Sequence, residues 1–464
     1  MKKLRLLVAA LLCAALPLGP LAACGGSSDP AADPQTIVVA AFKGAYGDAF
    51  WANIKTEFER LYAAEGYKIS YEAKQNIEDT VRPQINAGQG PDVIYLPIGQ
   101  EKALTEALVK SKGIEKITAL LDEKIPGEDV KLRDKIMPGF LNGSSTNPYD
   151  DGDTYMLPLF YSPLGLFYNK NLFNADGTNG KYKLPVTWQD FLALKSAVNP
   201  DGNSVIDLSK GEKYLFAYPN SGYVSEMLYS LIASKAGTDA LDKFFGYDVS
   251  VYDDPNFIHV FEQTAALKDY VYPSSWDSAQ NYKQNQNALL QNNALFLPCG
   301  AWLPEEMADY TPAPGFEYGF TAHLDMGGGR YSHAKIEQLY ILKQSKKKDV
   351  AKKFLAFMFS DAAAAIIARD AGALTPTVNA LTIARQNNYF PEQKYSYFDI
   401  YSGDNAAKLS AGDFAAASVT GVVWRNTFTG NFDELMSSSD MTAAKWLKEL
   451  KDDSVKLFDA KVQV

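Results

Sequence analysis

Apolar positions along the chain alternate between two spacings. Residues 36–42 (TIVVAAF) form a continuous apolar run that is β-branched at its start, which predicts a buried parallel strand. Over residues 50–61 the apolar side chains instead recur every three or four positions, which is the spacing of one helix face. The pattern then predicts a strand over 68–73, a helix over 80–87 and a strand over 92–96. A strand–helix alternation of this kind predicts an α/β layered fold.

The alternation continues through the rest of the chain, with no internal repeat. Further predicted strands cover residues 164–168, 215–218, 294–297 and 339–342. Further predicted helices cover residues 188–198, 225–233, 350–358 and 443–458. These elements extend the α/β prediction over nearly the whole body.

Length and composition restrict the class of protein. A chain of 464 residues suggests roughly two to four domains. With 47% hydrophobic and 22% charged residues, the composition is that of a globular protein and excludes a disordered, collagen-like or multi-span membrane chain. The net charge is -10 and no stretch is rich in lysine and arginine, which argues against a nucleic-acid partner. Aromatic residues reach 12%, which fits sugar-binding surfaces or simply a tyrosine-rich core.

The N-terminus resembles a bacterial lipoprotein signal. Basic residues within 1–5 precede an apolar stretch over 6–16, which is too short for a permanent membrane span, and Leu21–Ala22–Ala23–Cys24 follows. The resemblance implies a signal peptide over 1–23, lipidation of Cys24 and a flexible tether over 24–35. The protein would then be extracytoplasmic, anchored by Cys24 to the outer face of the cell membrane. The alternative is a plain secretory signal with an incidental cysteine.

The folded body lacks the common signatures of enzymes and metal proteins. Cys299 is its one cysteine, so no disulfide can form within it. His259, His323 and His333 form no zinc motif, and the acidic loops match no complete calcium pattern. There is no GxSxG motif and no complete phosphate loop. We therefore expect no enzymatic activity, no metal and no cofactor.

An ordered set of motifs resembles the solute-binding proteins of bacterial ABC importers, in the branch that binds carbohydrates. Each motif is weak alone, but together they run in the family's order from Thr36 to about Pro376. The matching segments are Ala87–Val93, Tyr155–Pro158, Leu166–Phe173, Thr187–Phe191, Cys299–Trp302, Lys346–Phe359 and Ala371–Pro376.

The resemblance implies a periplasmic-binding-protein-like fold, in which two α/β lobes joined by a hinge close on a ligand in the cleft between them. It places residues 36–161 and 339–388 in the first lobe and residues 162–338 and 389–464 in the second. It also implies a monomer that delivers a mono- or oligosaccharide to the transmembrane subunits of an ABC permease.

A sugar site needs aromatic faces for the ring and amide or carboxylate groups for the hydroxyls. Trp302 is the strongest candidate, because the matching family tryptophan stacks on sugar; the alternative is a core tryptophan. Loops that follow the first three strands and positions near the lobe crossings supply the remaining candidates, since ligands of open α/β sheets bind at the carboxyl ends of strands. These candidates are Tyr46, Asp48, Gln75, Asn76, Gln100, Tyr161, Ser162, Glu226, Glu337 and Gln338.

Two departures from the maltose-binding type bear on the ligand. Ser162 stands where that type has a glutamate, and Leu96–Pro97 stands where it has a second stacking tryptophan, which favours a shorter sugar. Residues 299–307 are similar to the branch that binds N-acetylglucosamine or its disaccharide. The competing hypothesis from another class is a lipid-anchored, secreted glycosidase or other polysaccharide-active enzyme, because paired carboxylates are common in this chain.

Overall fold

The computed structural model of the chain describes residues 33–44, 46–100, 102–141, 143–149, 151–174, 180–202, 205–273, 282–402, 406–415, 417 and 419–460. The predicted signal peptide, Cys24 and most of the predicted tether lie outside these residues. Within the described part, no helix has the length and the apolar character needed to cross a membrane.

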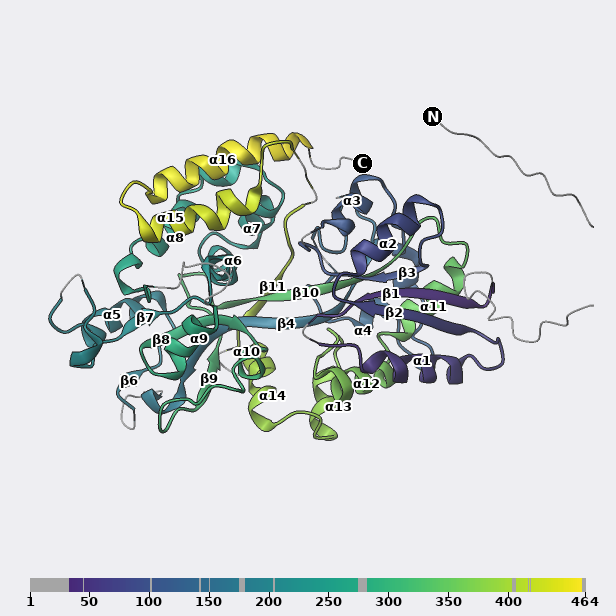
Figure 1. Cartoon of the computed structure of the whole chain (residues 1–464), viewed down its shortest axis with the longest axis horizontal. Coiled ribbons are helices and arrows are strands. Elements are labelled where there is room, and N and C mark those ends of the chain that lie inside the picture. The colour runs from purple at the N-terminus through teal and green to yellow at the C-terminus, as the bar shows by residue number, and fades with distance from the viewer. Residues whose placement is uncertain are drawn as a thin grey trace, which may run out of the picture.

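A long mixed sheet runs through the molecule, with helices packed on both of its faces (Figure 1). Its strands lie in the order β2-β1-β3-β10-β4-β8-β7, while β11 pairs with β10 and β9 with β4. The strands of this sheet are β1 (Thr36–Phe42), β2 (Lys68–Lys74), β3 (Val93–Tyr95), β4 (Met156–Asn169), β7 (Tyr214–Phe216), β8 (Ala294–Gly300), β9 (Tyr318–Thr321), β10 (Tyr331–Ile341) and β11 (Lys408–Ala411). A separate small sheet pairs β5 (Phe173–Asn174) with β6 (Tyr182–Lys183). The α/β prediction is confirmed.

The helices divide between the two ends of this sheet (Figure 1). Near β1–β3 lie α1 (Phe50–Leu61), α2 (Ile77–Asn86), α3 (Leu104–Lys110), α4 (Leu132–Lys135), α11 (Lys348–Phe357), α12 (Asp361–Ala371) and α13 (Ala380–Gln386). At the other end lie α5 (Trp188–Val198), α6 (Val224–Lys235), α7 (Thr238–Phe245), α8 (Pro255–Ala265), α9 (Tyr282–Leu290), α10 (Leu303–Glu306), α15 (Asn431–Ser437) and α16 (Ala443–Ala460). Helix α14 (Glu392–Phe398) contacts both α13 and β9.

The long strands β4 and β10 pass from one lobe to the other. The start of β4 pairs with the end of β10, where Met156 lies opposite Tyr340, while the end of β4 pairs with β8 and β9. The β4–β10 register shifts between Glu337 and Gln338. An irregularity of this kind breaks the regular ladder and bends the strand. It lies at the predicted crossing point, although the residue limits of the lobes remain a prediction.

Each lobe has its own packed core, built from the predicted helix faces. In α1, the buried Phe58 packs edge-on against Phe354 and Phe357 of α11, with ring centroids 5.5 and 5.6 Å apart. In the other lobe, Trp446 of α16 is fully buried and its ring lies 4.8 Å from that of Phe261. Aromatic burial of this kind supplies much of the free energy that holds each layer together.

Several elements are longer in the structure than the sequence predicts, and three of them show why. Both β4 and β10 extend well beyond the predicted 164–168 and 339–342, because prolines interrupt the β4 sequence and polar side chains alternate along β10. Helix α2 begins at Ile77 instead of the predicted Thr80, because Ile77 and Val81 are both buried and extend the apolar face by one turn.

Candidate functional site

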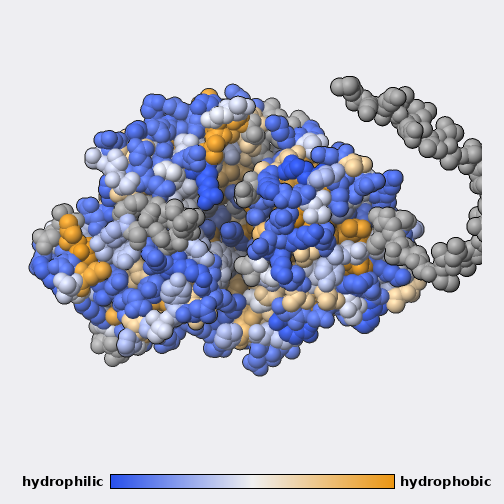
Figure 2. Space-filling view, viewed as in Figure 1, coloured by the Kyte–Doolittle hydropathy of each residue, from blue (hydrophilic) through white to orange (hydrophobic). Residues whose placement is uncertain are grey.

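A cavity of about 350 Å³ lies where the two lobes meet the crossing strands. Figure 2 shows the hollow between the two halves of a largely hydrophilic surface. The volume lies at the small end of the range of roughly 300–1,000 Å³ found for small-molecule pockets. Its lining residues come from both lobes and from β4: Tyr46, Tyr161, Ser162, Ala301, Trp302, Glu305, Glu306, Ala371, Gly372, Ala373, Lys394 and Phe398.

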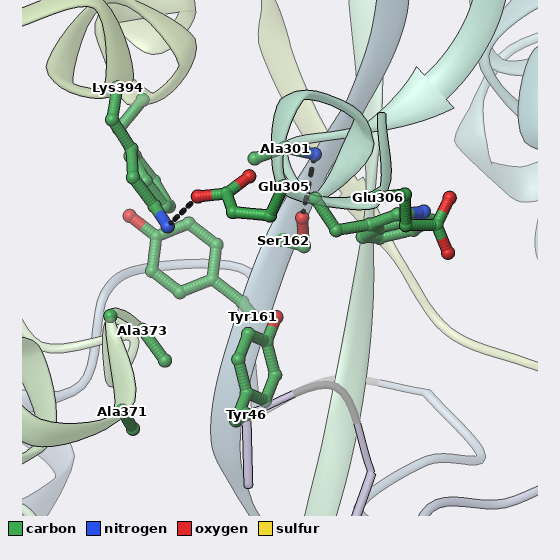
Figure 3. A pocket seen from close by; sticks show the side chains of 12 residues that line it. Tyr46, Tyr161, Ser162, Ala301, Glu305, Glu306, Ala371, Ala373 and Lys394 are labelled. Atoms are coloured by element: carbon green, nitrogen blue, oxygen red, sulfur yellow. Dashed lines mark hydrogen bonds and ion pairs between the residues drawn. The ribbon is translucent and has the colours of Figure 1, made fainter. Parts of the chain in front are cut away.

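Tyrosines from the first lobe and from β4 form one wall of the cavity. Tyr46 follows β1, and its ring packs edge-on against Phe160 with the centroids 5.0 Å apart. Tyr161 is held between the rings of Phe140 and Phe398, at 5.1 and 5.5 Å. In Figure 3 both tyrosines point into the space that Ala371 and Ala373 face from the other side. The result is a fixed aromatic surface with two hydroxyl groups.

Trp302 forms part of the facing wall, directly after β8. Its indole is half-buried and lies against the backbone of Gly300, so closely that a Cβ atom at residue 300 would stand 2.0 Å from Cζ3 of the ring. The ammonium of Lys335 lies over the Trp302 ring, 5.6 Å from its centre, within the range of a cation–π interaction. The ring is therefore positioned by its neighbours and is also open to the cavity.

Polar groups between these aromatic walls join the two sides. The Ser162 hydroxyl accepts a hydrogen bond of 3.2 Å from the backbone N–H of Ala301. Lys394 of α14 pairs with Glu305 of α10 at 2.6 Å (Figure 3). Glu306 accepts a hydrogen bond of 2.7 Å from the buried Gln286 amide. Fixed donors and acceptors beside aromatic faces are the chemistry that a hydroxyl-rich ring requires.

Four carboxyl groups outside the cavity lining have raised pKa values, and we call them the carboxyl set: Glu106, Glu226, Glu337 and Asp413. Burial is the main cause of the raised pKa in each of them. Asp413 raises the pKa of Glu106 and Glu226 further, while Lys335 lowers the pKa of Glu226, Glu337 and Asp413. The Tyr95 hydroxyl donates a hydrogen bond to Glu337 and also opposes its upward shift.

The raised pKa values predict a pH dependence of stability that can be isolated at Glu226. The folded state holds the Glu226 proton more tightly than the unfolded chain does, so lowering the pH through the raised pKa stabilises the fold. We therefore expect Glu226→Gln to be more stable than the wild type at pH 8. This difference in melting temperature should shrink as the pH falls toward the ordinary carboxyl pKa of about 4.

Buried histidines make the stability of the fold depend on pH in the opposite direction. The melting temperatures of the wild type and of Glu226→Gln must therefore be compared at each pH. Burial lowers the pKa of His323 to about 3 and of His333 to about 4, so these groups destabilise the fold as the pH falls below their unfolded value of about 6.5. They contribute equally to the wild type and the variant. A difference in melting temperature that stays constant from pH 8 to pH 4 would contradict the assignment of Glu226.

The structure brings four of the predicted site residues together in the cavity: Tyr46, Tyr161, Ser162 and Trp302. Glu226 and Glu337 belong to the carboxyl set and do not line the cavity. The other predicted residues have different surroundings. Asp48 forms an ion pair with Lys43 at 3.0 Å. Gln75 and Asn76 are exposed just before α2. Gln100 is half-buried in the turn before α3. The Gln338 amide is buried and accepts a hydrogen bond of 2.9 Å from the Ile98 N–H, which fixes the turn after β3. None of these five lines the cavity.

Sequence reasoning missed the cavity residues Glu305, Glu306 and Lys394, and also Lys335, Glu106 and Asp413, which interact electrostatically with one another or with Glu226. Three of them carried a signal that could have been used. Lys335 stands two positions before Glu337, so both side chains lie on the same face of a strand. Glu305 and Glu306 directly follow the Trp302 turn. The others come from helices and loops that lie far apart in the sequence and that only the tertiary structure brings together.

The fold resembles many solved structures. One is a chitin oligosaccharide binding protein, with 16% sequence identity, a TM-score of 0.63, and coverage of 91% of this chain and 99% of that one. Another is the sugar-binding protein MalE from Xanthomonas citri, with 15% identity, a TM-score of 0.65, and coverage of 91% and 97%. At such low identity these similarities establish the periplasmic-binding-protein-like fold with its two lobes.

Sequence comparisons identify the family. A protein of Brucella abortus (strain 2308), which its name describes only as a binding protein, is 23% identical over 211 residues, or 45% of this chain. The chain spans about half the length of this relative, 47%. The family model for bacterial extracellular solute-binding proteins matches residues 43–365, which is more than half of the chain. The chain therefore belongs to the bacterial extracellular solute-binding protein family.

Proposed function

We propose that the protein is the sugar receptor of an ABC importer, which binds a mono- or oligosaccharide between its lobes and delivers it to the transmembrane permease. The observation that carries this proposal is the cavity itself. It places the Trp302 ring and two tyrosines around fixed hydroxyl, carboxylate and ammonium groups, and its lining comes from both lobes. A ligand there would contact both lobes only when they are closed, so its binding would favour the closed form.

We infer that the ligand is short. The cavity of about 350 Å³ is small for a binding pocket, and Leu96–Pro97 supplies no second stacking tryptophan. The similarity of residues 299–307 to the N-acetylglucosamine branch, together with the structural likeness to a chitin oligosaccharide binding protein, supports N-acetylglucosamine or its disaccharide as the first ligand to test.

The proposal is tested by measuring the melting temperature of the protein with a panel of neutral mono- and disaccharides. A ligand that binds only the folded state stabilises it by about 2.7 kcal/mol at a concentration one hundred times its Kd. We expect at least one neutral sugar to raise the melting temperature and to be recovered intact by chromatography. A panel without any shift, or recovery of shortened sugars, would contradict the receptor assignment.

We further propose that the mature protein is held at the outer face of the membrane by acyl chains on Cys24. The support is the Leu21–Cys24 sequence, since two or more acyl chains give stable anchoring where one chain does not. Expressed with its full leader in a bacterial host, the wild type should fractionate with membranes. The Cys24→Ala variant should appear in the soluble extracytoplasmic fraction or remain as unprocessed precursor. Identical fractionation and identical mass of the two proteins would contradict lipidation, whereas Cys13→Ala should have no effect on the mature product.

A further inference from the structure

An ion pair stands on the solvent side of the cavity. Of the residues that line the cavity, Glu305 of α10 is the one that is exposed, with 56% of its side chain open to solvent. Its carboxylate pairs with the Lys394 ammonium of α14 at 2.6 Å, and in Figure 3 the two side chains reach toward each other from opposite sides. By contrast, Tyr161, Ser162 and Ala301 are buried and close the inner side of the cavity. The ion pair therefore marks the border between the cavity and the solvent.

Both partners of this ion pair are confined by their neighbours. Only 16% of the Lys394 side chain is exposed, and its ammonium lies 5.3 Å from the centre of the Phe390 ring. On another side, a Cβ atom at Gly372 would stand only 3.4 Å from the lysine Nζ. Glu305 belongs to the four-residue helix that directly follows Trp302. An exposed ion pair contributes little to stability by itself, but here it holds two otherwise flexible side chains in one position at the edge of the cavity.

We propose that the Lys394–Glu305 ion pair limits the length of the sugar that the cavity accepts, so that Lys394 and Glu305 are specificity-determining residues. This inference rests on the proposed function, since it concerns the ligand of the same cavity.

The physical argument compares two neutral sugars that differ by one unit. The shorter sugar lies against Trp302 and Tyr46 and leaves the ion pair intact. The longer sugar has to extend toward the solvent between Glu305 and Lys394, which separates the two charges and moves the ammonium away from the Phe390 ring. A cost that falls only on the wrong ligand produces specificity. Removing one partner of the ion pair therefore favours the longer sugar and leaves the aromatic contacts of the shorter sugar in place.

The test uses two sugars: the neutral mono- or disaccharide of the panel that binds most tightly, and the oligosaccharide that extends it by one unit. The first pair to use is N,N′-diacetylchitobiose and N,N′,N″-triacetylchitotriose. Dissociation constants of both sugars are measured by calorimetry for the wild type, Glu305→Ala, Lys394→Met and Lys451→Met. Lys451 is a matched control, because its ammonium pairs with Asp253 at 2.7 Å and neither residue lines the cavity. Melting curves establish that all four proteins are folded.

We expect the wild type to bind the longer sugar about tenfold more weakly than the shorter one. In Glu305→Ala and in Lys394→Met the affinity for the longer sugar relative to the shorter one should rise by about fivefold, while Lys451→Met should leave this ratio unchanged. Equal affinity of the wild type for both sugars would overturn the length limit. A ratio that stays unchanged in Glu305→Ala and Lys394→Met, including an equal loss of affinity for both sugars, would overturn the role of the ion pair in specificity. If no neutral sugar in the panel binds, the proposed function fails, which is a distinguishable outcome and removes this inference as well.

Discussion

Replacing Trp302 by alanine should weaken sugar binding by roughly thirty- to a thousandfold, corresponding to a loss of about 2–4 kcal/mol, while the melting temperature falls only slightly. The reason is the position of the indole, which is half-buried on the cavity wall and not enclosed in either core. The substitution removes the stacking face and the surface over which the Lys335 ammonium lies. Calorimetry and a melting curve on the same sample measure both effects.

Trp446→Ala provides the matched control for this substitution. Trp446 is fully buried in the second lobe and does not line the cavity, so its removal should cost about 3–5 kcal/mol of stability through lost transfer energy and an internal cavity. Any Trp446→Ala protein that remains folded should still bind sugar. If instead Trp302→Ala is strongly destabilised and binds sugar with full affinity, Trp302 is a core residue and the proposed site is wrong.

Gly300→Ala should also weaken sugar binding, although it adds only one methyl group. The new Cβ would stand 2.0 Å from Cζ3 and 2.3 Å from Cη2 of the Trp302 ring, far inside any real contact distance. Because β8 is fully buried and Gly300 is paired with Leu164 of β4, we expect the indole and not the strand to move. We expect a loss of about tenfold or more in sugar affinity, since the stacking face leaves its position.

The control for this substitution is Gly430→Ala, where the nearest atom to a new Cβ is the Asn426 Cβ at an ordinary 3.9 Å. That variant should bind sugar as the wild type does. Tryptophan fluorescence of Gly300→Ala should also differ from that of the wild type. Full sugar affinity in a folded Gly300→Ala protein would mean that the position of the indole does not matter for binding.

The sequence was most informative where one physical signal dominates. The apolar stripe of α1 and the capping box at Thr187 and Asp190, which begins α5, identify their helices directly. The continuous apolar run of β1, which is mostly buried, identified its strand. Periodicity is less informative for β4, whose residues are almost all buried and whose sequence contains two prolines. There the tertiary environment overrides the local pattern.

The same distinction applies to the site. Trp302 and Tyr46 were predictable because they follow strand ends, where ligands of α/β sheets bind. Lys394 was not predictable, because it reaches the cavity only through the packing of α14 between α13 and β9. The segment that precedes α13 is in turn joined to β4 by the hydrogen bond from the Tyr161 N–H to the Leu374 carbonyl, at 3.2 Å. Contacts between residues so far apart in sequence leave no local signal.

Small-angle scattering with and without a saturating sugar tests most directly whether the ligand binds between the lobes and draws them together. The measurement uses the best neutral sugar from the panel, on the wild type and on Trp302→Ala at the same sugar concentration. We expect the radius of gyration of the wild type to decrease when the sugar is added, and that of Trp302→Ala to stay unchanged because its site is unoccupied. An identical radius of gyration for the free and the fully saturated wild type would contradict binding between closing lobes.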